Sequence, residues 1–549
     1  MTVVIPAAGL GSRMGSFTKN YSKAMLTLGG KPIFSYIIEN FTKSDEIIVL
    51  LGYKGDLLKQ CIEACYPDWN ISFVTVDKYE GEGSGLGYSL LCARDKLNKP
   101  FMFWSCDTVL YDIDKDKSSF NVKSFITGDK NILFTSDAPE GHEYDYRFAL
   151  FTSYMGMEPK KLSRILPKGE GKFSDPDEIA PYIGVAYIND WQDFWAAADK
   201  NREAFIESGE SFGINAIKST VLVKNIYNWI DTGNRSIYED AKTRLNNKME
   251  DVILEKPDEA IWFVDNKVIK FHIDPKFILG RVSRIKTLLN KKQKLSIRVP
   301  ELLSYSNNTY TYVRANGKIM SKNVTPPIFN ALLKDYIGLA DVQDFPRSVE
   351  FYNDFYKDKT LKRIQKFVEE TGEPDEPAII NGRECLSAVE LVNKLNFEEL
   401  AKNAKFSYEV HGDFHLENVL IDFNKCEFVL LDWRQNFGNE AVIGDIYYDL
   451  GKMMHSLIVN HNMVKKNEFS VSTKKENGKS IVKIDIANTF IDNECMKELV
   501  EFCSEYNFSV KHMSIICALI FLNICACHTY PYSKFLYYLG RYLLQDLVS

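Results

Sequence analysis

The chain has 549 residues, of which 45% are hydrophobic and 26% are charged, and its formal net charge is −7. This length exceeds what one hydrophobic core usually organises, so we expect about two to four domains. The acidic balance argues against a nucleic-acid partner, because binding to a phosphate backbone needs a basic face.

The cysteines and the apolar runs bear on the cellular compartment of the protein. The eleven cysteines lack the paired spacing of a zinc site, and the chain opens on the strand-like TVVIPAAG without a basic, apolar leader. We therefore expect a cytoplasmic protein with reduced thiols. The longest apolar run, Met513–Cys527, contains Asn523 and is shorter than the ~20 residues that span a bilayer. It predicts a buried helix, and no membrane partner is expected.

Strands and helices alternate from Thr2 to about Ala241. The expected strands are Val3–Pro6, Glu46–Leu51, Ile71–Val76 and Phe101–Ser105, and the expected helices are Pro32–Phe41, Leu57–Cys65 and Tyr88–Lys96. This alternation is typical of an α/β fold with a doubly wound, mostly parallel sheet, which binds ligands at the carboxyl ends of its strands.

A charged stretch, Lys242–Asp258, lacks a strong apolar pattern and is the best linker candidate. We therefore predict one domain over residues 1–245 and a second, α+β domain over residues 246–549. After the linker, Ile261–Phe271 predicts a β-hairpin that turns at Asp265 and Asn266. The Asn-Gly turn in Glu476–Ile484 predicts a second, exposed hairpin.

The first strand is followed by a glycine-rich turn. Gly9 and Gly11 would let backbone N–H groups approach nucleotide phosphates without a clash with a Cβ atom, and Ala8 and Ser12 flank them. Two rival motifs fit less well. The third glycine of a dinucleotide fingerprint comes one residue late, and no Walker A loop occurs in the chain.

Residues 7–33, AAGLGSRMGSFTKNYSKAMLTLGGKPI, resemble the signature of sugar-nucleotide pyrophosphorylases and related nucleotidyltransferases, A-A-G-x-G-x-R…P-K…G-K-P. The resemblance implies that Arg13 and Lys23 are catalytic cations that face the triphosphate and the departing pyrophosphate. Ser22 replaces the proline that usually precedes this lysine.

The same resemblance continues downstream to about residue 241. GSGLGYSL contributes Gly85 to a loop over the nucleotide base, and WSCDTVL places Asp107 at the end of a strand. NWIDTGNRSIYEDA provides Asp231. The resemblance implies that Asp107 and Asp231 are the Mg²⁺ ligands, although Asp231 also fits a helix N-cap.

Residues 411–432, HGDFHLENVLIDFNKCEFVLLD, place Asp413 five residues before Asn418 and put Asp432 after the next apolar strand. This is the spacing of a kinase catalytic loop followed by a metal-binding Asp. Such chemistry needs a carboxylate beside the acceptor hydroxyl, and an amide oxygen and a second carboxylate on Mg²⁺.

The same region, with GDIYYDL at 444–450, closely resembles the aminoglycoside phosphotransferase and choline kinase branch of the kinase superfamily. The resemblance implies a two-lobed domain, with an N-lobe over about 255–320 and a C-lobe over about 321–549. It assigns Asp413 as the catalytic base or hydroxyl positioner, Asn418 and Asp432 as Mg²⁺ ligands, and Lys270 as the lysine on the ATP phosphates. However, Phe277–Leu289 contains no Glu or Asp to pair with Lys270.

A kinase makes a phosphomonoester and a nucleotidyltransferase consumes one, so the two resemblances imply consecutive steps on one small molecule. ATP phosphorylates a hydroxyl compound, and a second NTP, with CTP preferred over UTP, then forms the activated unit for surface-glycan synthesis. A sugar or polyol is the first choice of substrate, and an amino alcohol such as choline is the second. An aminoglycoside-modifying enzyme ranks lower, and the oligomeric state stays open.

Overall fold

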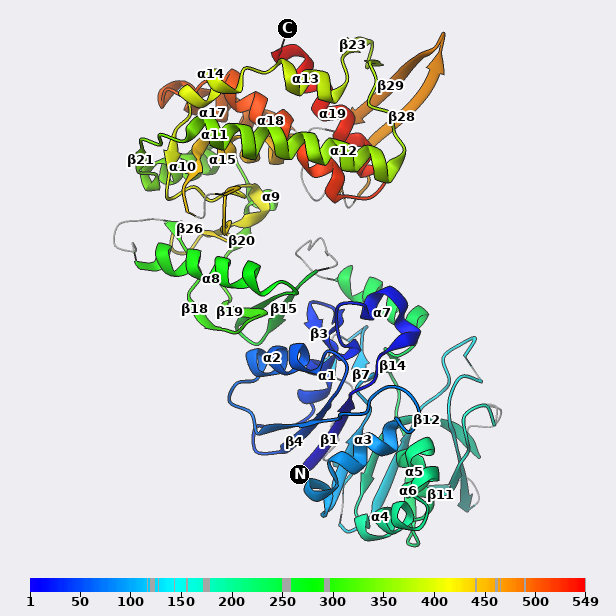
Figure 1. Cartoon of the computed structure of the whole chain (residues 1–549). Coiled ribbons are helices and arrows are strands. Elements are labelled where there is room, and N and C mark those ends of the chain that lie inside the picture. The colour runs from blue at the N-terminus through cyan, green and yellow to red at the C-terminus, as the bar shows by residue number, and fades with distance from the viewer. Residues whose placement is uncertain are drawn as a thin grey trace. The chain divides into compact units, whose positions relative to one another are not determined.

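The computed structural model describes residues 1–548 except 116, 119–123, 127, 143, 155–156, 171–177, 249–257, 291–296, 440–441, 460–462, 465 and 488–489. The chain divides into two compact units. The first unit contains residues 1–250, 255–275 and 304–311, and the second contains 251–254, 276–303 and 312–549. Figure 1 shows both units with many of their helices and strands labelled.

A nine-stranded sheet organises the first unit. In spatial order its strands are β10 (Phe148–Tyr154), β11 (Met157–Ile165), β13 (Val221–Asn225), β9 (Asn131–Thr135), β12 (Ile179–Ile188), β6 (Phe101–Trp104), β1 (Thr2–Ala7), β4 (Glu46–Leu51) and β5 (Ile71–Thr75). The four strands from β6 to β5 pair in parallel. The other half is mixed, because β12 runs antiparallel to both β6 and β9.

Helices cover both faces of this sheet. They are α1 (Ile33–Ile38), α2 (Gly55–Cys65), α3 (Leu86–Cys92), α4 (Trp191–Lys200), α5 (Arg202–Ser208) and α6 (Glu210–Asn215). A further helix, α7 (Arg235–Asn246), packs against the segments Thr27–Leu28 and Trp229–Asp231. Successive residues of β1 point to opposite faces, so Val3 and Ile5 join one core cluster with α1 and α2, and Val4 joins the other with α3 and α4. The predicted doubly wound α/β fold is therefore confirmed.

Short elements complete the edge of the sheet that carries the predicted nucleotide site. They are the 3₁₀ helices η1 (Ser12–Thr18) and η2 (Lys23–Met25) and the strands β2 (Thr27–Leu28), β3 (Lys31–Pro32), β7 (Thr108–Asp112), β8 (Lys117–Ser118) and β14 (Trp229–Asp231). A further 3₁₀ helix, η3 (Arg94–Leu97), precedes the amino end of β6.

The predicted hairpin after the linker packs onto the first unit. It consists of β15 (Glu259–Val264) and β16 (Lys267–His272), turns through Asp265 with a φ of 51°, and forms a sheet with β19 (Thr309–Val313) and β18 (Leu302–Tyr305). Trp262 is buried among the residues of α1 and α2, and its indole N–H donates to Thr27 Oγ1 at 2.9 Å. Phe263 N–H donates to the carbonyl of Gly30 at 2.8 Å.

These contacts bear on the predicted boundary at residues 245 and 246. The first part of the predicted linker is helical, because α7 ends at Asn246, and residues 249–257 lie outside the described part of the chain. The hairpin belongs to the first unit because its apolar side chains, such as Trp262 and Phe271, have no comparable core of their own. The exact boundary stays a prediction.

One large core dominates the second unit. Its helices are α8 (Pro275–Asn290), α9 (Met320–Asn323), α10 (Pro326–Leu339), α11 (Ser348–Phe351), the π-helix η5 (Tyr352–Asp358), α12 (Lys359–Thr371), α13 (Ala388–Lys394), α14 (Phe397–Lys402), η6 (Leu416–Asn418), α15 (Ile446–Ile458), α17 (Phe490–Glu505), α18 (Val510–Ile524), η7 (Cys525–Cys527) and α19 (Tyr532–Leu547). Within this unit, α12, α18 and α19 lie together (Figure 1).

Three small sheets complete the second unit. They are β17 (Ile297–Arg298) with β26 (Glu427–Leu430), β25 (Val419–Asp422) and β20 (Lys318–Ile319), then β21 (Val342–Gln343) with β24 (Phe406–Ser407) and β27 (Gly444–Asp445), and finally β23 (Arg383–Cys385) with β22 (Ala378–Ile380), β29 (Lys479–Ile486) and β28 (Phe469–Glu476). The predicted α+β class is confirmed. The second predicted hairpin is β28–β29, which turns at Asn477 and Gly478 with φ angles of 49° and 76°.

The long apolar run forms a core helix. By length and composition, Val510–Cys527 is apolar enough to cross a membrane, but 67% of it is buried inside the structure. Its residues belong to the core of the second unit, where α15 and α19 pack against it. This confirms the prediction of a buried helix.

Candidate active sites

A lysine–carboxylate pair lies beyond the carboxyl end of β1 and β6 in the first unit. Lys23 lies at the start of η2, and its Nζ is 2.5 Å from Oδ2 of Asp107, which follows β6. Ser105 donates its hydroxyl to the other carboxylate oxygen of Asp107, also at 2.5 Å. Parallel strands place their carboxyl ends at one edge, which explains how residues 84 positions apart meet.

The second predicted metal ligand lies beside this pair. Asp231 ends β14, and β14 pairs with β7 so that Asp231 lies opposite Thr108. Asp231 Oδ1 accepts a hydrogen bond from Gly233 N–H at 2.9 Å. A Cβ atom on Gly233 would clash with Asp107 and crowd Asp231, so the glycine allows the two carboxylates to approach each other. The structure therefore brings Lys23, Asp107 and Asp231 together.

Charge is unevenly distributed over this cluster. Burial alone would raise the pKa of Asp107, but the Lys23 ammonium holds it below its usual range. Burial and the neighbouring Asp107 charge raise the pKa of Asp231. Arg13 is exposed on η1, and its charge reaches both carboxylates. Two carboxylates beside one lysine leave a net negative charge when both ionise, and such an oxygen donor pair fits Mg²⁺.

The predicted phosphate turn is closely backed by the sheet. Gly11 has a φ of 68°, which favours glycine, and Ser12 begins the exposed part of η1. Ala8 lies so close to Gly52 that a Cβ atom on Gly52 would clash with the Ala8 carbonyl. Gly9 has open space around its Cβ position. The turn therefore packs against Gly52 at Ala8 and has open space at Gly9.

The second glycine-rich segment also has a packing role. A Cβ atom on Gly85 would clash with the carbonyl of Ile206, and one on Gly87 would clash with that of Phe205. These glycines let the start of α3 approach α5. The role of Gly85 in nucleotide binding stays a prediction.

In the second unit, a β-hairpin positions the predicted catalytic and metal-binding groups. Val419 in β25 lies opposite Leu430 in β26, and Leu431 N–H donates to the Asn418 carbonyl at 2.8 Å. This register places Asn418 before one strand and Asp432 after the other, at the same end of the hairpin. Asp432 has a φ of 61°, a conformation that few residues other than glycine adopt.

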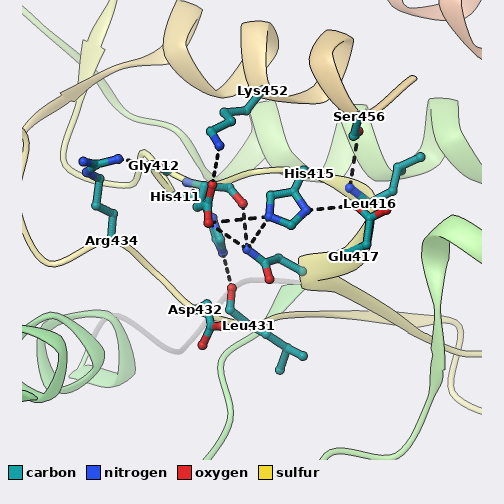
Figure 2. A network of polar contacts seen from close by, with 12 residues as sticks. His411, Gly412, His415, Leu416, Glu417, Leu431, Asp432, Arg434, Lys452 and Ser456 are labelled. Carbon is teal, nitrogen blue, oxygen red and sulfur yellow. Dashed lines mark hydrogen bonds and ion pairs between the residues drawn. The ribbon is translucent and has the colours of Figure 1, made fainter. Parts of the chain in front are cut away.

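Asp413 takes part in a polar network with Lys452, His415 and Asn418. Figure 2 shows this network, with Lys452 and His415 labelled. Lys452 Nζ is 2.8 Å from Asp413 Oδ1, and His415 Nε2 is 3.5 Å from Asp413 Oδ2. The Asn418 amide nitrogen is 3.0 Å from the Asp413 carbonyl and 3.3 Å from Asp413 Oδ2. Burial alone would raise the pKa of Asp413, but Lys452 and His415 hold it well below its usual range. The carboxylate is therefore kept ionised.

Buried hydrogen bonds fix the backbone of this loop. Asp449 accepts from the N–H groups of His411 and Gly412 at 2.5 and 2.7 Å, and from the Tyr336 hydroxyl at 2.7 Å. His411 Nε2 lies 2.7 Å from the Leu431 carbonyl. Burial lowers the pKa of His411 to about 3. Through these contacts, His411 and Asp449 hold the backbone of the loop.

The helix α8, which lacks an acidic residue, presents arginines to the same region. Arg281 donates to the carbonyls of Asp432 and Trp433, and Arg284 donates to those of Val410 and Val442 at 2.8 and 2.9 Å. Arg284 is only 2% exposed. α8 therefore holds the backbone on both sides of the catalytic segment.

Lys270 belongs to the first unit. It is on β16 in the first unit, opposite Ile261, whereas Asp413, Asn418 and Asp432 belong to the second unit. Its role on the ATP phosphates stays a prediction.

A cavity of about 160 Å³ opens beside Asp413 in the second unit. Lys452, which binds Asp413, is one of its lining residues. The lining residues are aromatic, aliphatic or basic with one amide and one thiol, namely Phe355, Tyr356, Lys359, Arg363, Arg434, Tyr448, Lys452, Leu519, Ile520, Asn523, Ile524 and Cys527.

Sequence reasoning missed the cations of this cavity. Lys452 is the only Lys or Arg in the otherwise largely apolar α15, where it lies three residues after Asp449. A lysine in such a helix is a sequence signal that could have marked Lys452 as a candidate site residue. Lys359 and Arg363 lie one turn apart on α12, but they are far in sequence from Arg434 and Lys452, and no local pattern singles them out. Among the described residues, no cluster of three or more His, Cys, Asp or Glu residues could hold a metal.

Two family models match the chain. Residues 3–115 match the MobA-like NTP transferase domain, and residues 383–463 match the Phosphotransferase enzyme family. The chain therefore joins an NTP transferase domain to a phosphotransferase domain, both from families of enzymes. This confirms the predicted fusion.

Relatives that match the first domain bear the names of nucleotidyltransferases. A UTP–glucose-1-phosphate uridylyltransferase of Haemophilus influenzae is 31% identical over 166 residues, which cover 25% of this chain and 55% of the relative. A Bacillus subtilis protein named "Probable glucose-1-phosphate cytidylyltransferase" is 35% identical over 89 residues, which cover 16% and 34%. The chain spans about half the length of the curated relatives it matches. A solved UDP-glucose pyrophosphorylase complexed with UDP-glucose is 18% identical with a TM-score of 0.37, over 45% of this chain and 99% of that one.

Proposed function

We propose that the chain is a bifunctional enzyme that performs two consecutive transfers. In the first, a small hydroxyl compound X–OH and ATP give X–phosphate and ADP. In the second, X–phosphate and an NTP give NDP–X and pyrophosphate. The observation that carries the proposal is that each unit contains its own mostly buried lysine–carboxylate pair, Lys452–Asp413 and Lys23–Asp107, within a domain of the matching family.

In the kinase step, Asp413 accepts the proton of the acceptor hydroxyl as its oxygen attacks the γ-phosphorus of ATP. Lys452 keeps that carboxylate ionised and fixes its orientation. Asn418 and Asp432, which the hairpin places at one end, are the residues that would hold Mg²⁺. Mg²⁺ would neutralise charge on the ATP phosphates.

In the nucleotidyl step, a phosphate oxygen of X–phosphate attacks the α-phosphorus of the NTP and the bond to pyrophosphate breaks. Arg13 and Lys23 supply positive charge for the triphosphate and the leaving group. Asp107 and Asp231 would hold Mg²⁺, which would reduce the negative charge that opposes attack. The backbone of Ala8, Gly9, Gly11 and Ser12 would cradle the phosphates at the turn.

The first choice for X is a sugar or polyol, because relatives of the first domain bear the names of glucose-1-phosphate nucleotidyltransferases. CTP remains the first choice of NTP and UTP the second, and the named relatives include both a cytidylyltransferase and a uridylyltransferase. The product would serve surface-glycan synthesis. A cytoplasmic location fits the supply of NTPs and the eleven free cysteines.

Choline remains the alternative for X and an aminoglycoside the lower one. Both are cations, and the cavity beside Asp413 presents four basic side chains. Like charges at close range repel, so this lining weighs against both alternatives.

The test is a two-stage screen on the full chain. Hydroxyl compounds are first tested with ATP and Mg²⁺ for ADP release, and each phosphorylated product is then tested with CTP, UTP, GTP and ATP for pyrophosphate release. We expect one product of the first stage to be consumed in the second. If phosphorylated products never support pyrophosphate release, the consecutive scheme is wrong.

A further inference from the structure

We propose that the cavity beside Asp413 is the acceptor subsite of the kinase and that it selects a small hydroxyl compound bearing a negative charge, as a carboxylate or a phosphate group. This inference rests on the proposed kinase function and specifies its substrate class. The cavity is lined by Lys359, Arg363, Arg434 and Lys452 and by no carboxylate.

The cavity adjoins the catalytic group through Lys452. Lys452 lines it and binds Asp413 Oδ1 at 2.8 Å, while Arg434 Nη1 is 3.4 Å from the Gly412 carbonyl. A hydroxyl placed on Asp413 therefore has the rest of its molecule beside these cations. The volume of about 160 Å³ limits the acceptor to a small compound.

The four cations differ in how they are already engaged. Lys452 is committed to Asp413, and Arg434 donates to the Asn436 carbonyl at 2.8 Å and the Tyr448 hydroxyl at 3.2 Å. Arg363 donates to the Cys527 thiol at 3.0 Å, and Lys359 lies over the Phe355 ring at 4.3 Å. Across the described residues, no carboxylate forms a salt bridge with Lys359 or Arg363, so these two have charge to offer a ligand.

Burial and the neighbouring like charges both disfavour the charged form of Lys359. Burial, followed by the charges of Arg434, Arg363 and Lys452, lowers the pKa of Lys359 to about 7. A protein anion would ordinarily offset such a cluster, because partly buried charges are usually paired. A bound anion would restore the charge of Lys359 and relieve the repulsion, which gives an anionic ligand a favourable interaction that a neutral one lacks.

The rest of the lining suits a carbon skeleton. Phe355, Leu519 and Ile520 supply apolar walls, and Asn523 supplies an amide that can bind a further hydroxyl. Apolar walls with few polar groups are usual for small-molecule subsites. An acceptor with a short carbon chain, a hydroxyl and one anionic end matches this composition.

The main rival is that these cations bind the phosphates of ATP. In Figure 2, Lys452 lies above the network and Asp432 lies below it. Asp432 is the predicted metal ligand and hence marks the nucleotide side, so the cavity behind Lys452 faces the other substrate. The KM for ATP and the KM for the acceptor, measured in variants of the cavity, separate these two interpretations.

The experiment uses the full chain and three-carbon probes that differ in charge: glycerol, glycerate, glycerol 3-phosphate and serinol, with inorganic phosphate as a bare anion. Binding is measured by calorimetry with Mg²⁺ and a nonhydrolysable ATP analogue, and turnover by ADP release with ATP. We expect an anionic probe to bind about tenfold or more tighter than glycerol, and serinol to bind weakest. Comparison of glycerate with glycerol 3-phosphate identifies the anionic group.

Two variants locate the effect. Lys359→Gln and Arg363→Gln should each remove most of the preference for the anion and raise its KM without changing the KM for ATP. The control is Lys366→Gln on the same helix, whose ammonium pairs with Glu370 at 3.5 Å and does not line the cavity. It should retain the wild-type preference.

Several results would overturn the proposal. They are equal binding of glycerol and the anions, no binding of any anionic probe, a preference that survives in both variants, or a rise in the KM for ATP alone. The kinase function is judged separately. If neutral acceptors yield ADP and the variants behave as wild type, that function stands and the charge selectivity fails. If anions bind in the cavity but ADP never forms, the charge selectivity stands and the kinase function fails.

Discussion

The two units use the same local arrangement in different settings. In the first unit, Lys23 lies 2.5 Å from Asp107, and in the second, Lys452 lies 2.8 Å from Asp413. In both, the lysine outweighs the effect of burial and lowers the pKa of the carboxyl group. A second carboxylate, Asp231, adjoins the first pair, whereas the second pair adjoins a histidine and an amide.

This difference matches the roles proposed for the two carboxylates. Asp107 beside Asp231 forms a pair of oxygen donors with excess negative charge, which suits a divalent cation. Asp413 is surrounded by donors that keep it ionised, which suits acceptance of a proton from a hydroxyl. The same ion pair therefore serves different chemistry because of what lies next to it.

The largest effect is expected from Asp413→Asn, which removes the proton acceptor but preserves shape. ATP-dependent phosphorylation should fall by about 10³, while pyrophosphate release from supplied X–phosphate is retained. ADP and pyrophosphate assays on the same preparation check this. Asp485→Asn, on an exposed part of β29, is the control. Loss of both activities in a folded Asp413→Asn protein would show that the two sites are not independent.

The converse change, Asp107→Asn, should lower pyrophosphate release by about 10² and leave ADP release unchanged, because a charge that would hold the metal is lost. The same two assays apply. Asp95→Asn, on exposed η3, serves as the matched control in the first unit. Near-normal pyrophosphate release in Asp107→Asn would remove this residue from the metal site.

A third test asks whether the two units can be separated at the predicted boundary. Trp262→Ala should destabilise the first unit by about 3 kcal/mol or more, because a buried indole is removed from beside Phe34. Calorimetric unfolding measures the shift. Phe263→Ala on the other face of β15 should cost less, since this ring is only partly buried.

Truncated chains extend that test. A fragment that ends near residue 245 lacks Trp262 and should be less stable than one that ends at residue 275 and keeps the hairpin. Equal stability of the two fragments would show that the hairpin contributes nothing to the first core and would support a boundary at 245.

The smallest effect concerns pH in the kinase cavity. Burial and the charges of Arg434, Arg363 and Lys452 lower the pKa of Lys359 to about 7, and the Cys527 thiol adjoins it. Above that pH the ammonium loses its proton, so the KM for an anionic acceptor should rise as pH increases through 7, by less than about tenfold. Lys359→Arg keeps its charge and should flatten this rise relative to a neutral acceptor. An unchanged profile in Lys359→Arg would assign the pH dependence to another group.

Local patterns predicted much of this molecule. Strand–helix alternation gave the parallel half of the first sheet, because a strand buried on both faces reads as a short apolar run. The mixed half from β9 to β13 was not read from sequence, since its pairings join distant segments. The Asp-Asn and Asn-Gly turns were placed correctly because positive φ angles restrict residue choice.

The sequence by itself determined which two families the chain joins and which carboxylates are candidates, because phosphoryl chemistry demands particular residue types at close spacing along the chain. Only the tertiary structure decided that the hairpin with Trp262 belongs to the first core, that α8 supports the catalytic loop through Arg281 and Arg284, and that Lys359 and Arg363 meet Lys452 beside Asp413. These outcomes depend on packing between segments distant in sequence, and no local spacing rule constrains such contacts.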